Sequence, residues 1–83
     1  MRVIFMHPRD SLTFPAEVEA DTTGQTCVDN LVKEEFLTSE PQDRPYTLTL
    51  ERTQKQILKT MTMGEAEIRD NDTISIVQQE RGA

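Results

Sequence analysis

The run Met1-Arg2-Val3-Ile4-Phe5-Met6 decides the fold, because every residue in it except Arg2 is apolar. Such a run is typical of a strand that lies centrally in a sheet or is covered on both faces. Turn residues follow at Pro8-Arg9-Asp10-Ser11, and apolar side chains then recur at alternate positions from Leu12 to Val18. We therefore predict a hairpin. Its second strand contains Pro15, which has no N–H to donate, so we expect that strand at a sheet edge.

One helix is predicted after the hairpin. Thr22 and Gln25 have the spacing of a capping box, which satisfies the free amides at a helix start. From Thr26 to Phe36 apolar residues recur every three to five positions, so one face of the helix covers the sheet. Cys27 lies on this apolar face, and we expect it to pack as a small hydrophobic residue and not to act as a nucleophile.

The second half of the chain returns to strand patterns. Residues 38–45 contain two prolines and predict an exposed connection. Residues 46–50 then alternate strictly between apolar and polar side chains, residues 56–58 predict a short fourth strand, and residues 73–77 predict the last strand. The stretch between the last two strands is irregular, with scattered apolar anchors.

A single helix can cover only one face of a sheet, so the elements predict an α+β protein with a mixed sheet of four to five strands. The apolar first strand and the last strand can both lie centrally if they are parallel neighbours. That arrangement is the β-grasp. We expect residues 1–77 to form this domain and residues 78–83 to form an extended tail that makes few contacts with it.

Composition excludes several classes of function. A chain of 83 residues buries only roughly 60 to 65% of its unfolded surface, which disfavours a deep catalytic cleft, so we do not expect an enzyme. The formal net charge of −6 opposes nucleic-acid binding. The single cysteine forms no internal disulfide, and no apolar stretch is long enough for a membrane span, so we expect a cytoplasmic protein. His7 has no second ligand at metal spacing, and no cofactor is expected.

The chain resembles the ubiquitin-like proteins over nearly its whole length, in the manner of a bacterial or otherwise divergent member. Residues 1–5 resemble the opening strand of that family, and residues 17–22 resemble its acidic second strand and helix start. Residues 56–58 and 72–77 resemble its later strands, and the ending Arg81-Gly82 resembles its tail.

The resemblance implies a protein modifier that is conjugated through its C-terminal carboxylate. In the family, an activating enzyme binds ATP, adenylates that carboxylate and passes it to a cysteine as a thioester. A conjugating enzyme then transfers it to an amine of a target protein, and a deconjugating protease can reverse the isopeptide bond. Ala83 would be the reacting residue here, and Arg81 and Gly82 would form the threading tail. Gly82 suits threading because it lacks a Cβ, whereas Ala83 departs from the usual di-glycine ending.

Strand alternation also places a set of side chains on the sheet face opposite the helix. In ubiquitin this face carries an apolar patch that binding domains recognise. Val77 matches the last-strand element of that patch, but threonines occupy the third strand, so we expect ubiquitin receptors to bind weakly. The predicted partner-binding face comprises Ile4, Met6, Thr47, Thr49, Ser75 and Val77.

Two further functions stay open at this point. One is a ubiquitin-like adaptor that is never conjugated and that scaffolds a protein assembly, such as a secretion or defence complex, through its sheet face. The other is a sulfur carrier, which also activates its C-terminal carboxylate. Fold class does not separate these alternatives from a modifier.

Overall fold

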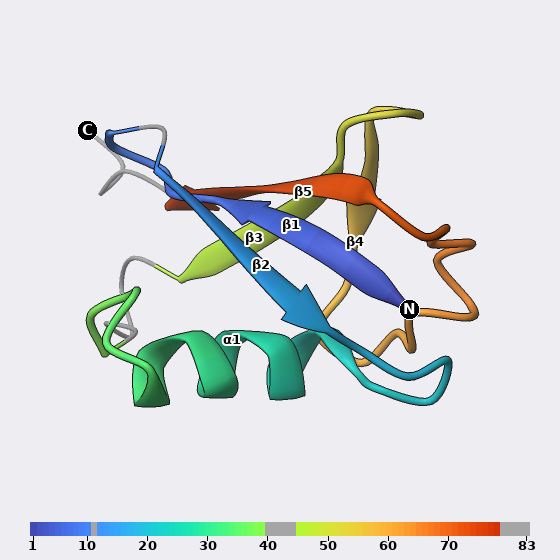
Figure 1. Cartoon of the computed structure of the whole chain (residues 1–83), viewed down its shortest axis with the longest axis horizontal. Helices are drawn as coiled ribbons and strands as arrows, with labels where there is room; N and C mark the ends of the chain where they lie inside the picture. The colour runs from blue at the N-terminus through green and yellow to red at the C-terminus, as the bar shows by residue number, and fades with distance from the viewer. Residues whose placement is uncertain (11, 40–44, 79–83) are drawn as a thin grey trace.

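The computed structural model describes residues 1–10, 12–39 and 45–78. Within these ranges the chain forms a mixed five-stranded sheet and one helix, an arrangement consistent with a β-grasp fold (Figure 1). The predicted α+β class is confirmed. In chain order the elements are β1 (Arg2–Met6), β2 (Thr13–Glu17), α1 (Gly24–Lys33), β3 (Tyr46–Leu50), β4 (Lys55–Ile57) and β5 (Asp72–Gln78).

The sheet has the strand order β2-β1-β5-β3-β4. Strands β1 and β5 are parallel neighbours near the centre, as predicted, and the other neighbouring pairs are antiparallel. Pro15 pairs with Ile4 and lies in β2, which confirms that its strand is at an edge. A proline in this place removes an N–H only from the outer row of the edge strand, where no neighbour needs it.

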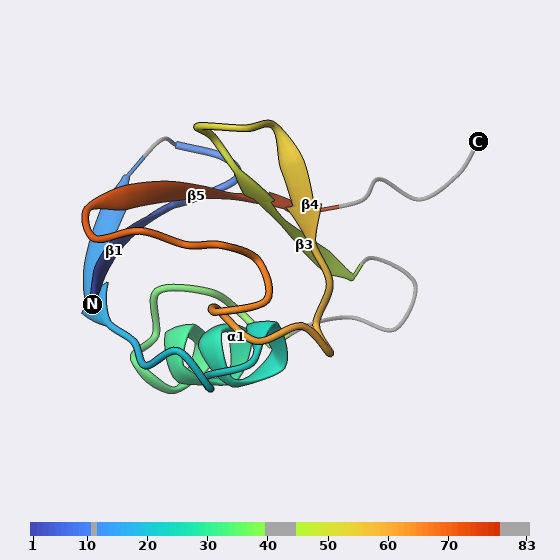
Figure 2. The same cartoon turned by 90° about the vertical axis from the view of Figure 1, so that its right-hand side faces the viewer.

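Helix α1 packs on one face of the sheet, and no described element covers the opposite face (Figure 2). The core lies between the two layers and includes Cys27, which is 3% exposed, as expected of a packing residue. Apolar side chains from every strand except the edge strand β2 reach this layer fully buried. They are Val3, Phe5, Tyr46, Leu48, Leu50, Ile57, Ile74 and Ile76.

The helix begins two residues earlier than predicted, and the predicted capping box is wrong. Thr23 is the N-cap, and its hydroxyl accepts a hydrogen bond from the Thr26 amide at 3.2 Å. Gly24 and Gln25 are already helical, and their amides donate to carbonyls of the 59–61 segment at 2.9 and 3.0 Å. The hydroxyl of Thr22 instead accepts from the Glu19 amide at 3.0 Å. Tertiary contacts therefore fix the helix start.

The helix also ends three residues before the predicted Phe36. Its last helical residue is Lys33, and Glu35 takes a left-handed conformation with φ 63°. The Phe36 amide then bonds the Leu31 carbonyl at 2.9 Å, which turns the chain back. This turn places the Phe36 ring 5.3 Å from that of Phe14 in the edge strand. Phe36 therefore contacts Phe14 at this end of the core and does not continue the helix.

The later strands differ slightly from their predicted bounds. Leu58 lies outside β4 and is 52% exposed. Strand β5 extends to Gln78, which pairs with Tyr46, so the first residue of the predicted tail belongs to the sheet. Residues 79–83, which make up the rest of that tail, lie outside the described residues.

A buried carboxylate joins the irregular segment before β5 to the sheet. Asp72 is 8% exposed and accepts a two-pronged interaction from the Arg52 guanidinium, with distances of 3.1 Å to Nε and 3.2 Å to Nη2. The Arg69 amide adds a third hydrogen bond at 2.8 Å. The hydrogen bond from Arg52, aided by that amide, lowers the pKa of Asp72 despite its burial.

Candidate functional site

The six side chains of the predicted partner-binding face all lie on the open face of the sheet. Cross-strand pairing brings neighbours from β2 and β4 onto the same face, because paired residues share a face. None of the side chains in this extended set is charged. We call it the uncharged patch, and it comprises Ile4, Met6, Thr13, Pro15, Thr47, Thr49, Gln56, Thr73, Ser75 and Val77.

The sheet register makes the patch continuous. Met6 pairs with Thr13 on one side and with Ser75 on the other. Ser75 pairs in turn with Thr49, which pairs with Gln56. This single row crosses all five strands, and side chains directly opposite each other in neighbouring strands lie within contact distance.

The patch combines apolar and hydroxyl groups. Ile4 and Met6 are half-buried, whereas Val77 is 47% exposed. The Thr47 hydroxyl donates to the Val77 carbonyl at 3.2 Å, and this bond holds the Thr47 side chain against strand β5. The surface can therefore bury apolar atoms and form hydrogen bonds at the same time.

Charged groups lie at the boundary of the uncharged patch. Arg2 and Glu17 pair across β1 and β2 at one end. At the other side Glu51 follows β3 directly, and its carboxylate accepts hydrogen bonds from the Ser75 hydroxyl and, at 3.1 Å, from the Gln54 side-chain amide. The Glu51 carboxylate thus lies beside Ser75, within the row that crosses the patch.

The predicted conjugation residues Arg81, Gly82 and Ala83 lie outside the described residues. The strand that leads toward them ends at Gln78, beside the turn between β1 and β2. There the Arg9 guanidinium donates to the Gln78 side-chain oxygen at 3.5 Å. The described part of the chain therefore brings the six binding-face residues together but does not include the three conjugation residues.

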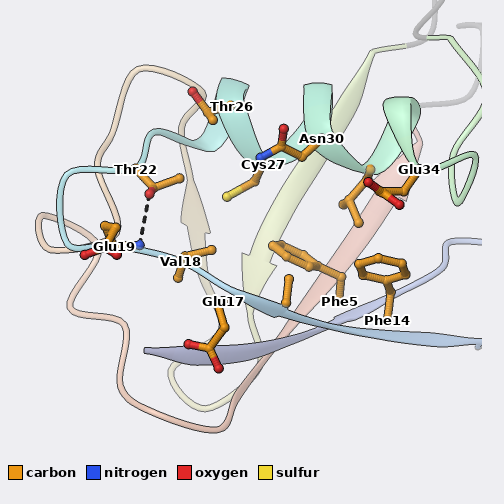
Figure 3. A pocket seen from close by; sticks show the side chains of 12 residues that line it. Phe5, Phe14, Glu17, Val18, Glu19, Thr22, Thr26, Cys27, Asn30 and Glu34 are labelled. Atoms are coloured by element: carbon orange, nitrogen blue, oxygen red, sulfur yellow. Dashed lines mark hydrogen bonds between the residues drawn. The ribbon is translucent and has the colours of Figure 1, made fainter.

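A groove between the edge strand β2 and helix α1 is a second candidate, and sequence reasoning missed it. Its volume is about 120 Å³, and Phe5, Val18 and Cys27 line it (Figure 3), together with Leu31. The groove exists because one helix is narrower than the sheet it covers, so the edge strand projects beyond the helix. No sequence pattern reports the width of that gap.

Two residues with reactive side chains, Cys27 and His7, have defined surroundings in the fold. Burial raises the pKa of the Cys27 thiol to about 11, so the thiolate needed for nucleophilic attack is scarce at neutral pH. The His7 ring packs edge-on against Phe36 at 5.4 Å, and its Nδ1 lies 2.8 Å from the Asp10 carboxylate. Among residues 1–10, 12–39 and 45–78, no three His, Cys, Asp or Glu side chains are grouped closely enough to hold a metal ion.

Comparison with known proteins adds no identification. No protein-family profile matches the chain, and no curated protein sequence matches it. Within the described ranges, no helix has both the length and the apolar character needed to cross a bilayer.

Proposed function

We propose that the chain is a ubiquitin-like, non-catalytic domain that binds a protein partner through the uncharged patch. The observation that carries this proposal is a continuous block of ten uncharged side chains that crosses all five strands of the open face, with Arg2, Glu17 and Glu51 around it. Charged residues make up 29% of the whole chain, whereas the ten patch residues include none. Depletion of charge is a mark of the buried centre of a protein interface.

The chemistry of the patch favours a protein partner. A nucleic acid needs cations to neutralise its phosphates, whereas the patch has none and the whole chain carries a formal charge of −6. Apolar side chains at Ile4, Met6 and Val77 can be buried against a partner. The hydroxyls of Thr13, Thr49 and Thr73 can donate and accept hydrogen bonds, and those of Thr47 and Ser75, which already donate within the chain, can accept them from the partner.

Site-specific photo-crosslinking in the source cells tests this proposal. We expect a photoreactive residue at Thr49 to give the same discrete adduct as one at Val77, because both lie on the patch. The matched control is Asp29, an exposed residue of α1 on the other side of the molecule. Adducts that form equally at all three positions, or at Asp29 alone, would contradict the proposal.

Conjugation to other proteins is the second candidate function, and the resemblance of residues 1–5, 17–22, 56–58, 72–77 and 81–82 to the ubiquitin-like family favours it. In this proposal the carboxylate of Ala83 is adenylated by an ATP-dependent activating enzyme and transferred through thioesters to an amine of a target. Described residues support it at one point. Strand β5 lies centrally in the sheet and anchors the chain up to Gln78, five residues before Ala83 in the sequence. The single cysteine supports the cytoplasm as the compartment.

Intact mass and activation assays test conjugation. We expect a thioester with the activating enzyme that disappears with thiol, and none after deletion of Gly82 and Ala83. Failure to form any adenylate or thioester, or a natural protein whose intact mass shows residues beyond Ala83, contradicts this function. Neither result bears on the uncharged patch, so the two candidates are tested separately.

A further inference from the structure

Backbone hydrogen bonding alternates along β3 and fixes the orientation of its neighbour β4. The Glu51 amide, which directly follows β3, bonds the Thr73 carbonyl of β5 at 3.0 Å. The Leu50 carbonyl accepts a bond at 2.8 Å from the Gln54 amide, which directly precedes β4. Successive residues of a strand bond opposite neighbours, so the even-numbered residues of β3 bond β4 and the odd-numbered residues bond β5.

The middle residue of β4 therefore turns its backbone groups outward. Gln56 pairs with Thr49, an odd-numbered residue of β3, so this pair exchanges no hydrogen bonds. The amide and the carbonyl of Gln56 point away from β3, and no further strand follows because β4 is an edge strand. Among residues 1–10, 12–39 and 45–78, no loop bonds these two groups. Gln56 thus presents one donor and one acceptor to solvent, which is what an added strand needs.

A hollow of about 200 Å³ lies beside the same strand. The segment that follows β4 runs on the helix side of the sheet (Figure 2) and contributes to the lining of this hollow. Its apolar lining comes from Ile57 and from the half-buried Met61 and Ala66. An apolar cavity of about 150 Å³ accommodates benzene, so this hollow is large enough for one branched aliphatic side chain.

The charged groups around the hollow differ in what they already contact. The Glu65 carboxylate accepts hydrogen bonds from the Thr62 amide at 3.0 Å and from the Thr62 hydroxyl at 3.2 Å. The Glu67 carbonyl accepts from the Arg52 guanidinium at 3.0 Å, which brings a cation near that residue. Lys55 is exposed, and within the described residues no carboxylate pairs with it. An acidic residue opposite Lys55 in an added strand would form a cross-strand pair of opposite charge.

The same lysine disfavours a second copy of the chain as the added strand. Two copies paired antiparallel about Gln56 would place Lys55 opposite Ile57 of the second copy. The two Lys55 side chains would then be diagonal neighbours at about 7–8 Å, where like charges repel. Only one residue of this three-residue strand offers outward hydrogen bonds against that repulsion. The occupant is therefore a segment of another protein.

We propose that the edge of β4 binds an extended segment of a partner protein as a sixth strand, antiparallel to β4. The central residue of the segment exchanges two backbone hydrogen bonds with Gln56. The residue before it is a branched aliphatic one opposite Ile57, and its side chain enters the hollow beside Met61 and Ala66. The residue after it is acidic and lies opposite Lys55. This site uses the Gln56 backbone and the helix side of the sheet, whereas the uncharged patch lies on the open face.

Titration of the ¹⁵N-labelled chain with a synthetic peptide tests the proposal by NMR. The probe is acetyl-Thr-Thr-Val-Thr-Glu-Thr-Thr-amide, in which valine and glutamate flank the central threonine. We expect amide shifts at Gln56, Ile57 and Ala66, and slower hydrogen exchange of the Gln56 amide. N-methylation of the central threonine removes the donor to Gln56 and should weaken binding at least about tenfold. N-methylation of the glutamate removes an amide that points away from β4, so the affinity should stay within about twofold.

Variants of the chain provide a second set of tests. Gln56→Pro removes the outward amide and should abolish binding, and it should fold because that amide bonds nothing within the sheet. Lys55→Glu should weaken binding about fivefold, because a pair of opposite charges becomes a pair of like charges. Lys33→Glu makes the same change of charge on α1 and should leave the affinity unchanged. If Gln56→Pro does not fold, the two N-methylated peptides still decide the question on the wild-type chain.

Several results would overturn the proposal. They are no binding at millimolar peptide, equal binding of the two N-methylated peptides, and a Gln56 amide that exchanges equally fast with and without the peptide. Shifts confined to Thr73 and Val77 would also overturn it, because the peptide would then occupy the uncharged patch. Loss of the β4 site leaves the proposed function of the patch intact, since the crosslinking positions Thr49 and Val77 lie on the open face.

Discussion

The substitution Gly24→Ala should destabilise the protein, although the general rule predicts the opposite. Gly24 is the first residue of α1, and none of the described glycines has a positive φ. Replacing a helical glycine by alanine normally stabilises a protein by about 0.4–1 kcal/mol, because alanine restricts the unfolded chain. The structure predicts a loss of stability instead, because Gly24 packs directly against the backbone of Leu58 and Lys59, which follow β4.

The magnitude follows from the contact that a new Cβ would make. It would lie 2.8 Å from the Leu58 carbonyl oxygen and 3.2 Å from the Lys59 Cα, both backbone atoms. Ordinary contact begins near 3.4 Å, so the oxygen must move by 3.4 − 2.8 = 0.6 Å. The hydrogen bonds from Gly24 to Met61 and from Gln25 to Lys59 resist that movement. Overpacking costs about 1–3 kcal/mol, so the middle of this range less the middle of the gain from alanine leaves a net loss of about 1.3 kcal/mol.

Chemical denaturation followed by far-UV circular dichroism measures this loss. Each kcal/mol lowers the melting temperature of a domain of this size by about 4–8 °C, so thermal scans provide a second reading. Gly64→Ala is the matched control, because its nearest contact is the Ala20 carbonyl oxygen at 3.1 Å and should yield more easily. A Gly24→Ala variant as stable as the wild type, or more stable, refutes the packing of α1 against Leu58 and Lys59.

Three other outcomes are expected. The pKa of Asp72 is lowered in the folded state, so its stabilising contribution is complete above the unfolded pKa of about 4 and is lost as pH falls through the lower folded pKa. As the pH falls from about 5 to about 2, the denaturant midpoint should therefore decrease less for Asp72→Asn than for the wild type. An equal decrease in the two proteins contradicts the pairing of Asp72 with Arg52. Glu35→Gly should raise the unfolding free energy by about 0.5–1 kcal/mol, because glycine relieves the left-handed backbone at φ 63°; a loss of stability argues against that turn. Cys27 should react with iodoacetamide only as the protein unfolds, since it is 3% exposed, and rapid labelling of the native protein would show that it is accessible.

Much of the sheet could be predicted because strand alternation and proline chemistry act locally. Pro15 alone marks an edge strand, and the apolar run of residues 3–6 marks a central one, as the structure confirms. The helix bounds could not be predicted in this way. A glycine at position 24 disfavours a helix by propensity, yet the helix starts there because only a residue without a Cβ fits against Leu58. Phe36 fits the helical period but leaves the helix to contact Phe14.

The two candidate surfaces also differ in how far the sequence predicts them. The alternation of β3 and β5 predicts which side chains share the open face, and the register confirms their grouping around Thr49 and Ser75. The extent of the uncharged patch becomes evident only when the register adds Thr13 and Gln56 from the two edge strands. The groove between β2 and α1 has no sequence signature, because it depends on how far a strand projects beyond a helix.

The affinity of the crosslinked partner for surface variants tests the central claim most directly. Thr49 lies near the middle of the row that crosses the uncharged patch, between Ser75 and Gln56. A lysine there places an unpaired charge within the interface and should weaken binding by about tenfold or more. Asp29→Lys, on the helix, should leave the affinity unchanged. If Thr49→Lys binds the partner as tightly as the wild type does, the uncharged patch is not the recognition surface.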